Sequence, residues 1–474
     1  MERVRRVKIV ATLGPATDGL ELDMVRAGLD VARLNFSHGT ADEHARRCSA
    51  VREAAKTAGR AVAVMQDLQG PKIRVGSLLG GQPVQLVAGQ QLVITTHAIV
   101  GTAERISCTY QHLAQDVRAG DRILLDDGRI RLSVLGCSDG SVTARVESGG
   151  PLGEHKGINL PGVAVSSPAI TDKDRIDMAY GLQELAVDFV ALSFVRTADE
   201  VRAAHDLMRS LGRTAPLVVK LEKGEAIENL DAILQIADAV MVARGDLGVE
   251  LAPEQVPMLQ KRIIQRANHR GIPVITATQM LESMTTDETP TRAEASDVAN
   301  AVWDGSDAIM LSAETATGRH PLVVLGMMDR IARAAEKTEA IPLQTRRARE
   351  DRPRGYAAAV TNAARVLAED LDASAIVGVT RSGLTAELLS RGRATVPIFA
   401  FSPDQEVCRR LALWWGVIPV HQHLAEDLQA NIDQMERYLV ESGSAAADDT
   451  VVITGSHPFG YGVHTNFVKF HVLS

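Results

Sequence analysis

Eight short apolar segments constrain the fold of this chain more than any other feature of its sequence. Near-continuous runs of Val, Ile, Leu and Ala are typical of parallel strands that are covered on both faces. Helical patterns fill most of the intervals, so eight parallel strands alternating with helices predict an α/β fold, the TIM (β/α)8 barrel. The apolar segments lie at residues 7–11, 29–34, 61–67, 187–193, 217–221, 239–243, 273–277 and 308–312, and the helical patterns at 41–58, 198–211, 225–236 and 254–269.

The long connection after the third segment has a different texture. Apolar residues alternate with polar ones, as at Ile130 and Leu132, and Asp-Gly pairs mark turns between the runs. This pattern is typical of half-buried antiparallel strands. We therefore expect a small β-barrel domain inserted at residues 71–168, within a catalytic barrel domain formed by residues 1–70 and 169–345.

A third domain is expected over residues 346–474. The polar, arginine-rich run 344–354 follows a predicted helix at 321–337 and resembles a linker. Further on, apolar strands again alternate with helices, which favours an α/β doubly wound sheet. The strands of this sheet are predicted at residues 375–379, 397–401 and 450–454.

The composition argues against several kinds of partner. A net charge of -8 and a pI near 5.9 disfavour nucleic acid, because binding to a phosphate backbone usually needs a basic face. No stretch approaches the ~18 apolar residues of a membrane span, so no membrane partner is expected. The cysteines are scattered and form no C-x-x-C pair, which indicates reduced thiols and a cytoplasmic protein.

Polar residues follow the ends of the predicted barrel strands, where the chemistry of a TIM barrel takes place. Two of the segments bring carboxylates and a lysine to this rim, at Lys220, Glu222 and Asp246. Paired carboxylates suit Mg²⁺, and a nearby lysine suits a phosphoryl group in transfer. The other strand-end candidates are Arg33, Asn35, Ser37, His38, Asp67, Leu68, Lys72, Arg74, Gly245, Thr278, Ser312 and Glu314.

Some of these residues have simpler structural interpretations. Asn35 and Ser37 are oxygen donors that could surround a cation, but they also form turns, and His38 could cap a helix. Residues 291–294 have capping-box spacing and are assigned to helix initiation. The pair at 414–415, two tryptophans, is expected to fill the core of the third domain or a subunit contact. The chain contains neither a P-loop nor the protein-kinase signatures.

Eight ordered motifs lie at residues 8–15, 33–39, 70–74, 156–162, 241–248, 277–284, 290–294 and 309–315. Together they resemble the motifs of the pyruvate kinase family. The resemblance covers the barrel, the insert and, more loosely, the third domain. It implies transfer of the phosphoryl group of phosphoenolpyruvate to ADP in glycolysis, giving ATP and, through an enolate, pyruvate, in a homotetramer.

The resemblance also implies roles for the strand-end residues around the substrate. Glu222 and Asp246 would hold Mg²⁺ (or Mn²⁺), and the amides of Gly245 and Asp246 would bind the substrate carboxylate. Lys220 and Arg33 would hold the phosphoryl group and neutralise the charge that develops on it. The remaining catalytic candidates lie near the enolate carbon: Thr278, which also contacts substrate, and Ser312 with Glu314 on a proton path.

The nucleotide contacts implied by the resemblance are Asn35, His38, Arg74 and Lys156. Lys156 belongs to the inserted domain, which would then act as a lid that excludes water. A metal-dependent TIM-barrel lyase or aldolase, which would need neither Lys156 nor Arg74, is the first alternative. A catalytically inactive homologue that binds an effector is the second.

The chain departs from the family pattern in the region of the monovalent cation. Many members read Thr-Lys-Gly-Pro-Glu where this chain has Leu68-Gln69-Gly70-Pro71-Lys72. An ammonium tethered at Lys72 can supply the positive charge that K⁺ would otherwise provide. The region formed by Asn35, Ser37, Asp67, Leu68 and Lys72 is therefore expected to work without K⁺.

A loop in the third domain resembles one that binds the phosphate of an allosteric effector. The loop runs from Thr380 through Arg381, Ser382 and Gly383 to Thr385. Within it, Leu384 stands where an arginine is common. The identity of the phosphorylated effector, a sugar phosphate or AMP, is therefore left open by the sequence.

Overall fold

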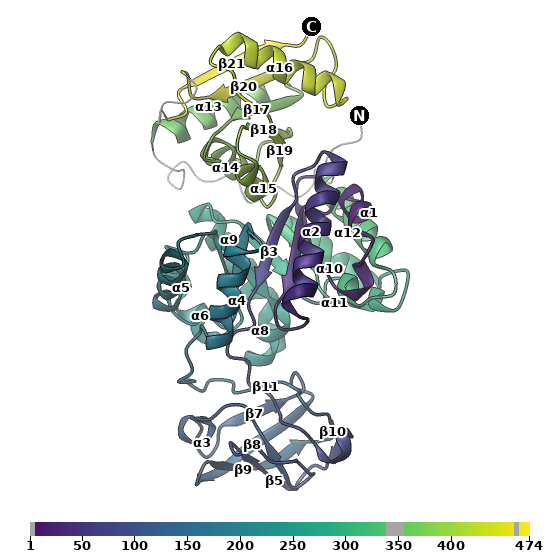
Figure 1. The fold of residues 1–474 in the computed structure, drawn as a ribbon, viewed down its shortest axis with the longest axis vertical. Helices are drawn as coiled ribbons and strands as arrows, with labels where there is room; N and C mark the ends of the chain where they lie inside the picture. The colour runs from purple at the N-terminus through teal and green to yellow at the C-terminus, as the bar shows by residue number, and fades with distance from the viewer. Residues whose placement is uncertain (1–4, 338–354, 459–463) are drawn as a thin grey trace.

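The computed structural model describes residues 5–337, 355–458 and 464–474. Figure 1 shows three domains in a row: a barrel surrounded by helices in the middle, a β-domain at one end and an α/β domain at the other. The predicted linker at 344–354 and the expected boundary between residues 345 and 346 lie outside the described residues. None of the described helices is long and apolar enough to cross a membrane.

All eight predicted apolar segments are strands of one closed parallel barrel. Each strand pairs with its neighbours in the order β1-β16-β15-β14-β13-β12-β3-β2. Their side chains are almost entirely buried, which explains the continuous apolar sequence. The strands are β1 (Lys8–Thr12), β2 (Val31–Asn35), β3 (Ala63–Asp67), β12 (Phe189–Leu192), β13 (Leu217–Leu221), β14 (Ala239–Ala243), β15 (Val274–Ala277) and β16 (Ala308–Leu311).

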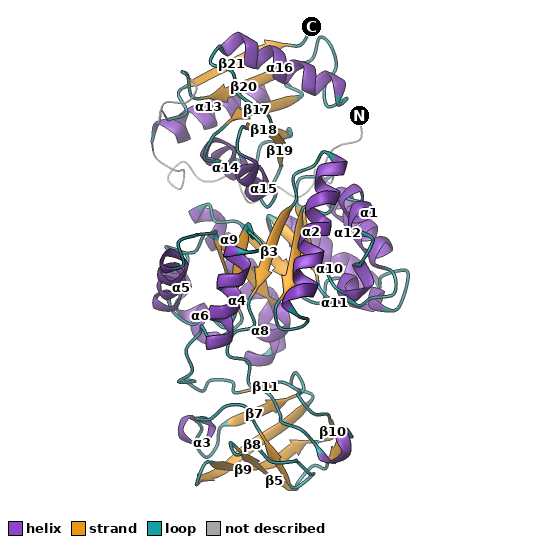
Figure 2. Cartoon of the chain, viewed as in Figure 1, coloured by secondary structure: helices purple, strands orange, loops and turns teal. Residues whose placement is uncertain are grey.

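Helices surround the barrel on its outer face (Figure 2). The capping box predicted at Thr291 is present, since its hydroxyl accepts from the Glu294 amide at the start of α10. The helix predicted at 225–236 is two short helices that meet at Asn229. The helices are α1 (Glu21–Arg26), α2 (Ala41–Ala58), α4 (Asp172–Gln183), α5 (Ala198–Ser210), α6 (Gly224–Glu228), α7 (Leu230–Ile233), α8 (Arg244–Glu250), α9 (Val256–Arg270), α10 (Arg292–Trp303), α11 (Ala313–Ala316) and α12 (Pro321–Glu336).

The insert between β3 and α4 is a curled half-barrel with its own apolar core. A six-stranded sheet, in the order β11-β7-β8-β9-β5-β6, packs with the two-stranded sheet β10-β4. The β8–β9 hairpin turns at Asp139 and Gly140, whose φ angles of 44° and 70° suit a tight turn. Its elements are β4 (Val84–Leu86), β5 (Gln91–Thr95), β6 (Arg105–Ser107), α3 (Leu113–Asp116), β7 (Arg122–Leu125), β8 (Ile130–Ser138), β9 (Ser141–Ser148), β10 (Gly150–Leu152) and β11 (Ile158–Asn159).

The C-terminal domain is a mixed α/β sheet in the order β19-β18-β17-β20-β21. The three predicted strands form its centre. The prediction missed the two edge strands, of which β21 is antiparallel to β20. The elements are α13 (Tyr356–Asp370), β17 (Ala375–Val379), α14 (Leu384–Arg391), β18 (Ile398–Ser402), α15 (Gln405–Leu411), β19 (Val417–His421), α16 (Leu428–Glu441), β20 (Thr450–Gly455) and β21 (Phe467–Val472).

The C-terminal domain is fixed to the barrel by buried polar contacts. Arg393 forms an ion pair of 2.8 Å with Asp307, and Arg409 one of 2.8 Å with the fully buried Asp188. Trp414 packs in the core of the C-terminal domain, as expected, but Trp415 joins the main core of the barrel. The second tryptophan therefore belongs to the interface between the two domains.

Candidate active site

Lys220 is the centre of an ion-pair network at the carboxyl ends of the barrel strands. Its Nζ lies 2.7 Å from Glu222 Oε1 and 3.4 Å from Asp67 Oδ1, and it donates to Ser193 Oγ at 2.8 Å. Arg33 donates from Nε to Asp67 Oδ2 at 2.7 Å. The barrel thus brings together four of the predicted residues, which come from three different strands or strand ends.

The charges of this network stabilise one another although the side chains are buried. Burial alone would lower the pKa of Lys220, but Asp67 and Glu222 raise that pKa above its usual range. Burial alone would raise the pKa of Asp67, but Lys220 and Arg33 lower it. Both side chains are therefore charged at neutral pH, and Lys220 presents a fixed positive charge to the rim.

Glu222 and Asp246 meet the chemical requirements of a magnesium site. Glu222 Oε1 forms an ion pair of 2.7 Å with Lys220 Nζ, and its Oε2 accepts from the Phe194 amide at 2.8 Å. A carboxylate oxygen has two lone pairs, so each oxygen can also bind a cation. Burial raises the pKa of Glu222, Lys220 lowers it and Asp246 raises it, which shows that the two acids repel each other. The described residues contain no group of three or more His, Cys, Asp or Glu residues arranged for a metal. A pair of carboxylates is nevertheless sufficient for Mg²⁺, which keeps several waters and substrate oxygens as ligands.

Thr278 and Gly245 lie together at the ends of β15 and β14. The Gly245 amide donates to Thr278 Oγ1 at 2.7 Å, and this hydroxyl donates to the Ala277 carbonyl at 2.6 Å. Thr278 has a φ of 69° and the following residue, Gln279, has a φ of 53°, an uncommon conformation for residues with a side chain. The amide expected to bind a carboxylate therefore already has an oxygen partner, which a ligand would displace.

Ser312 and Glu314 interact at the end of β16. Glu314 is fully buried and accepts from the amides of Ser312 at 2.6 Å and Leu281 at 3.3 Å. The carboxylate thereby connects the loop after β16 with the loop after β15. This arrangement holds the two loops beside Thr278.

Asn35 and Ser37 form a turn, which is one of the two interpretations given above for these residues. Asn35 Oδ1 accepts from the Ser37 amide at 3.2 Å. The side chain of Leu68 is buried, and its carbonyl accepts from Ser193 Oγ at 2.7 Å. Burial lowers the pKa of His38. The positive charges of Arg74, Lys72 and Arg33 lower this pKa further.

The remaining nucleotide candidates lie in the insert. Arg74 donates to the carbonyl of His155 at 3.0 Å, and Lys156 forms an ion pair of 2.9 Å with Asp126. Lys72 lies beside Gly157, where an added Cβ would be 3.7 Å from its Cε. Among the described residues, the ion pairs of Asp67 are with Arg33 and Lys220 and not with Lys72.

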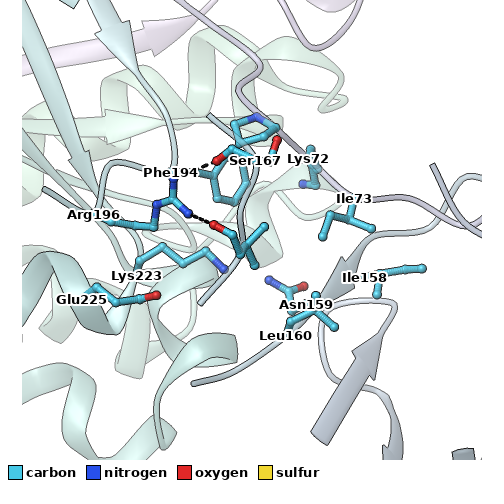
Figure 3. Close-up of a pocket in the computed structure, with 12 residues that line it drawn as sticks. Lys72, Ile73, Ile158, Asn159, Leu160, Ser167, Phe194, Arg196, Lys223 and Glu225 are labelled. Carbon is cyan, nitrogen blue, oxygen red and sulfur yellow. Dashed lines mark hydrogen bonds between the residues drawn. The ribbon is translucent and has the colours of Figure 1, made fainter. Parts of the chain in front are cut away.

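A narrow pocket separates the insert from the barrel (Figure 3). Ile73, Ile158 and Asn159 line it from the insert, and Phe194 and Lys223 line it from the barrel. Glu250 at the end of α8 accepts from Asn159 at 3.0 Å and from Lys223 at 2.6 Å. This contact joins the insert directly to the helix that carries Gly245 and Asp246.

Thr12, Ser193 and Glu250 also contact this site, although they were not among the residues expected from the sequence. Thr12 accepts from Arg33 at 2.8 Å, and Ser193 connects Lys220 with Leu68. Both follow the rule of polar residues at strand ends, applied to the first and fourth strands, and could have been found by it. Glu250 could not, because a buried acid at the end of a helix has no signature in sequence.

The predicted effector loop has the geometry of a strand-to-helix turn. Thr380 Oγ1 accepts from the Gly383 amide at 2.9 Å, and Thr385 and Thr465 share a hydrogen bond of 2.8 Å. Arg381 and Ser382 are exposed. Arg381 lines an open hollow on the outer side of the loop, together with Pro403, Asp404, Gln405 and His421.

Comparison with known protein families gives matches over most of the chain. A family described as "Pyruvate kinase, barrel domain" matches residues 4–325. A second, described as "Pyruvate kinase, alpha/beta domain", matches residues 358–471.

Curated and structurally determined relatives agree with these matches. The chain is 46% identical to a pyruvate kinase of Mycobacterium tuberculosis over 471 residues, which are 98% of each protein. It is 43% identical to that of Geobacillus stearothermophilus, over 99% of this chain and 81% of the relative. A crystal structure of a pyruvate kinase from Cryptosporidium parvum superposes with a TM-score of 0.92 at 36% identity, over 99% of this chain and 96% of the other.

Proposed function

The chain belongs to the pyruvate kinase family, and we propose that it transfers the phosphoryl group of phosphoenolpyruvate to ADP through the residues of this rim. The observation that carries the proposal is the Lys220 ammonium, held between Asp67 and Glu222 and close to Arg33. A fixed positive charge in a buried site stabilises charge that develops during transfer without reorganisation of solvent.

In this proposal Lys220 and Arg33 bind the phosphoryl group from two sides. Arg33 offers a planar fork of donors, and its Nε and one Nη are already oriented by Asp67 and Thr12. Lys220 also neutralises charge on the enolate oxygen as the phosphoryl group leaves. Asp67, which is only 1% exposed, keeps both cations in place.

Glu222 and Asp246 would hold a Mg²⁺ or Mn²⁺ ion. Such an ion, when bound, offsets negative charge on the substrate oxygens and on the phosphoryl group. Asp246 and Gly245 also present the backbone amides of the first turn of α8, which favour an anion such as the substrate carboxylate. The carboxylate would replace Thr278 Oγ1 as the partner of the Gly245 amide.

Protonation of the enolate carbon is assigned to the neighbourhood of Thr278. Its hydroxyl already exchanges hydrogen bonds with Gly245 and Ala277 and can pass a proton from water. Ser312 and Glu314 lie on the adjacent strand end and would continue this proton path.

We assign the ADP phosphates to the positively charged side of the cleft. His38, Arg74 and Lys156 would contact the nucleotide, with Asn35 at its edge. Arg74 and Lys156 belong to the insert, so its closure over the barrel would complete the site and exclude water.

A coupled assay for pyruvate and ATP tests the proposal directly. Pyruvate formation that requires both phosphoenolpyruvate and ADP would support it. Cleavage of phosphoenolpyruvate or of an aldol substrate without ADP would favour the lyase or aldolase alternative. Binding of an effector without turnover of any substrate would favour the inactive homologue.

Independence from K⁺ is the second part of the proposal. Lys72 contributes positive charge at His38, on the same side of the cleft as Arg33 and Arg74. Asp67 is already balanced by two cations, and the Asn35 side chain is used in a turn. These observations favour a site whose positive charge is supplied by side chains.

Allosteric activation is the third part. A phosphorylated metabolite would bind the loop from Thr380 to Thr385 at the beginning of α14 and raise the affinity for phosphoenolpyruvate. Sugar phosphates and AMP should activate the wild type but not a Ser382→Asp variant. Equal activation of both proteins would exclude the loop.

Two properties follow from family membership and remain proposals for this chain. We expect a homotetramer, which light scattering coupled to size-exclusion chromatography measures directly. We also expect a cytoplasmic protein, in keeping with its four free cysteines.

A further inference from the structure

A cavity of about 270 Å³ lies between the floor of the barrel and the C-terminal domain, away from the catalytic rim. The barrel contributes the first residues of β12 and β14 and the residues that precede β13, β14 and β15, including Pro216 and Pro273. The C-terminal domain contributes Trp414 together with Arg391 of α14 and Arg410 of α15, and Ser382 and Gly383 of the predicted effector loop reach one edge of the cavity. A cavity bounded by two domains is a common place for a small ligand.

The two arginines of this cavity lack partners for some of their donors. Within the described part of the chain, Arg391 stacks on Trp414 at 5.4 Å and lies 3.7 Å from Glu387, but it makes no hydrogen bond. Arg410 donates through Nη2 to Glu406 and Thr214, while its Nε is buried without an acceptor. The Nε of Arg391 is buried without an acceptor as well.

Unpaired buried donors are costly, because they lose their hydrogen bonds with water and gain none from protein. Arg391 packs closely against the turn after α9, where a Cβ added to Gly271 would be 2.7 Å from its Cδ and Nε. Burial lowers the pKa of Arg391, and Glu387 and Asp307 oppose that effect.

The acids near the cavity do not supply the missing acceptor. Burial raises the pKa of Glu387, Arg391 lowers it and Asp238 raises it again, and its nearest carboxylate oxygen lies 3.7 Å from Arg391 Nη2, beyond hydrogen-bond distance. Asp238 accepts from the Leu217 amide at 2.8 Å and lies 3.8 Å from His205, which fixes it on the barrel side. An anion from solution would satisfy the guanidinium groups better.

We propose that this interdomain cavity is a second ligand site, which binds a small organic anion through Arg391 and Arg410. Guanidinium forks bind phosphate and carboxylate groups, and Arg391 and Arg410 both line the cavity. The indole of Trp414 and the two prolines would contact the apolar or planar body of the ligand. Because the walls belong to two domains, an occupant also stabilises their present arrangement.

Two probes with the same planar body distinguish the head groups: phenyl phosphate and benzoate. Each probe is titrated into the full-length protein, and binding is measured by calorimetry and by tryptophan fluorescence. Saturating phosphoenolpyruvate and Mg²⁺, without ADP, keep phenyl phosphate from binding at the catalytic rim. We expect at least one probe to bind with one site per chain and to change the fluorescence of Trp414, a change that Trp414→Phe removes. The tighter probe identifies the head group.

Substitutions locate the binding site. Arg391→Leu and Arg410→Leu should each weaken binding about tenfold or more, the size expected for loss of a charged hydrogen bond. Arg437→Leu is the matched control, because Arg437 is exposed on α16 and belongs to no proposed site, and it should leave binding unchanged. Arg381→Leu tests whether a probe binds on the outer side of the effector loop. Circular dichroism checks that each variant is folded, and Arg391→Lys, which keeps the charge without the fork, should give a smaller loss.

Two results would overturn the proposal. The first is that neither probe binds the wild type. The second is that a probe binds the Arg391→Leu and Arg410→Leu variants as tightly as the wild type. If Arg381→Leu alone abolishes binding, the anion occupies the outer side of the effector loop and not the cavity.

Discussion

Asn159 of the inserted domain donates a hydrogen bond of 3.0 Å to the carboxylate of Glu250, the last residue of α8 in the barrel. Lys223 donates to the same oxygen at 2.6 Å, and the Glu250 side chain is 3% exposed. The first turn of α8 carries Gly245 and Asp246. The position of the insert is therefore connected to the substrate site by a single short helix.

The Asn159→Leu substitution tests this connection. It removes the donor of the insert but leaves Glu250 paired with Lys223, so no buried charge is left alone. We expect kcat/KM for phosphoenolpyruvate to fall about tenfold, within the range for a hydrogen bond to a charged group. The double variant Asn159→Asp with Glu250→Gln places the carboxylate on the insert and the amide on α8. It should recover part of the lost kcat/KM. An unchanged kcat/KM in Asn159→Leu would show that the contact does not affect the site.

The Lys220→Met substitution tests the central charge of the rim. It should lower kcat by roughly three orders of magnitude, because the ammonium acts mainly on charge that develops in the transition state. Binding of Mg²⁺ and phosphoenolpyruvate should be largely retained. Lys56→Met, at an exposed position of α2, is the control and should be fully active. Near-normal turnover of Lys220→Met would remove this residue from the mechanism.

The Asp246→Asn substitution tests the metal ligands. An amide supplies a neutral oxygen in place of a carboxylate, so the concentration of Mg²⁺ needed for half-maximal activation should rise about tenfold or more. Asp42→Asn, exposed in the first turn of α2, should leave Mg²⁺ activation unchanged. If Asp246→Asn also shows the wild-type Mg²⁺ dependence, another residue holds the ion.

Independence from K⁺ is tested at constant ionic strength. The rate in Na⁺ or tetramethylammonium buffer should be within about twofold of the rate in K⁺, since Lys72 supplies a tethered positive charge. Lys72→Glu should be slow without K⁺ and partly recover when K⁺ is added. A wild-type rate that rises about tenfold with K⁺ would mean that a cation still binds at this site.

His44 should make the barrel sensitive to mild acid. Its ring stacks on Phe36 at 4.1 Å, its Nε2 donates to the His38 carbonyl at 3.0 Å, and its Nδ1 is buried without a partner. Burial lowers the pKa of His44 from 6.5, the His38 carbonyl raises it, and Arg47 lowers it. Because the folded pKa is the lower one, the unfolded chain binds more protons, and stability is lost as the pH falls below 6.5.

The measurement is the thermal midpoint at pH 7.5 and at pH 5.5. We expect the decrease between these two pH values to be smaller in His44→Gln than in the wild type. His155→Gln, at an exposed position of the insert, should show the wild-type decrease. An equal decrease in all three proteins would assign the acid sensitivity to other groups.

The sequence was sufficient to predict the barrel because its strands are buried on both faces and therefore read as continuous apolar runs. It was less informative for β21, an edge strand in which Lys469 and Phe470 are exposed and the apolar pattern is weak. At the rim, strand ends identified Lys220 and Asp67 but not how their charges pair. The contact between Asn159 and Glu250 depends on the placement of one domain on another, which local patterns do not encode.

Trp415 has a consequence for the order in which the protein is made. It lies between Arg6 and Arg393, with the two guanidinium groups 5.6 Å and 4.7 Å from its ring, and it packs in the core of the barrel. Lys8 of the first strand also donates to the carbonyl of Val417. A nascent chain that has reached residue 337 has synthesised every barrel strand but not the tryptophan that covers their floor. The barrel therefore reaches its final packing only after the C-terminal domain has left the ribosome.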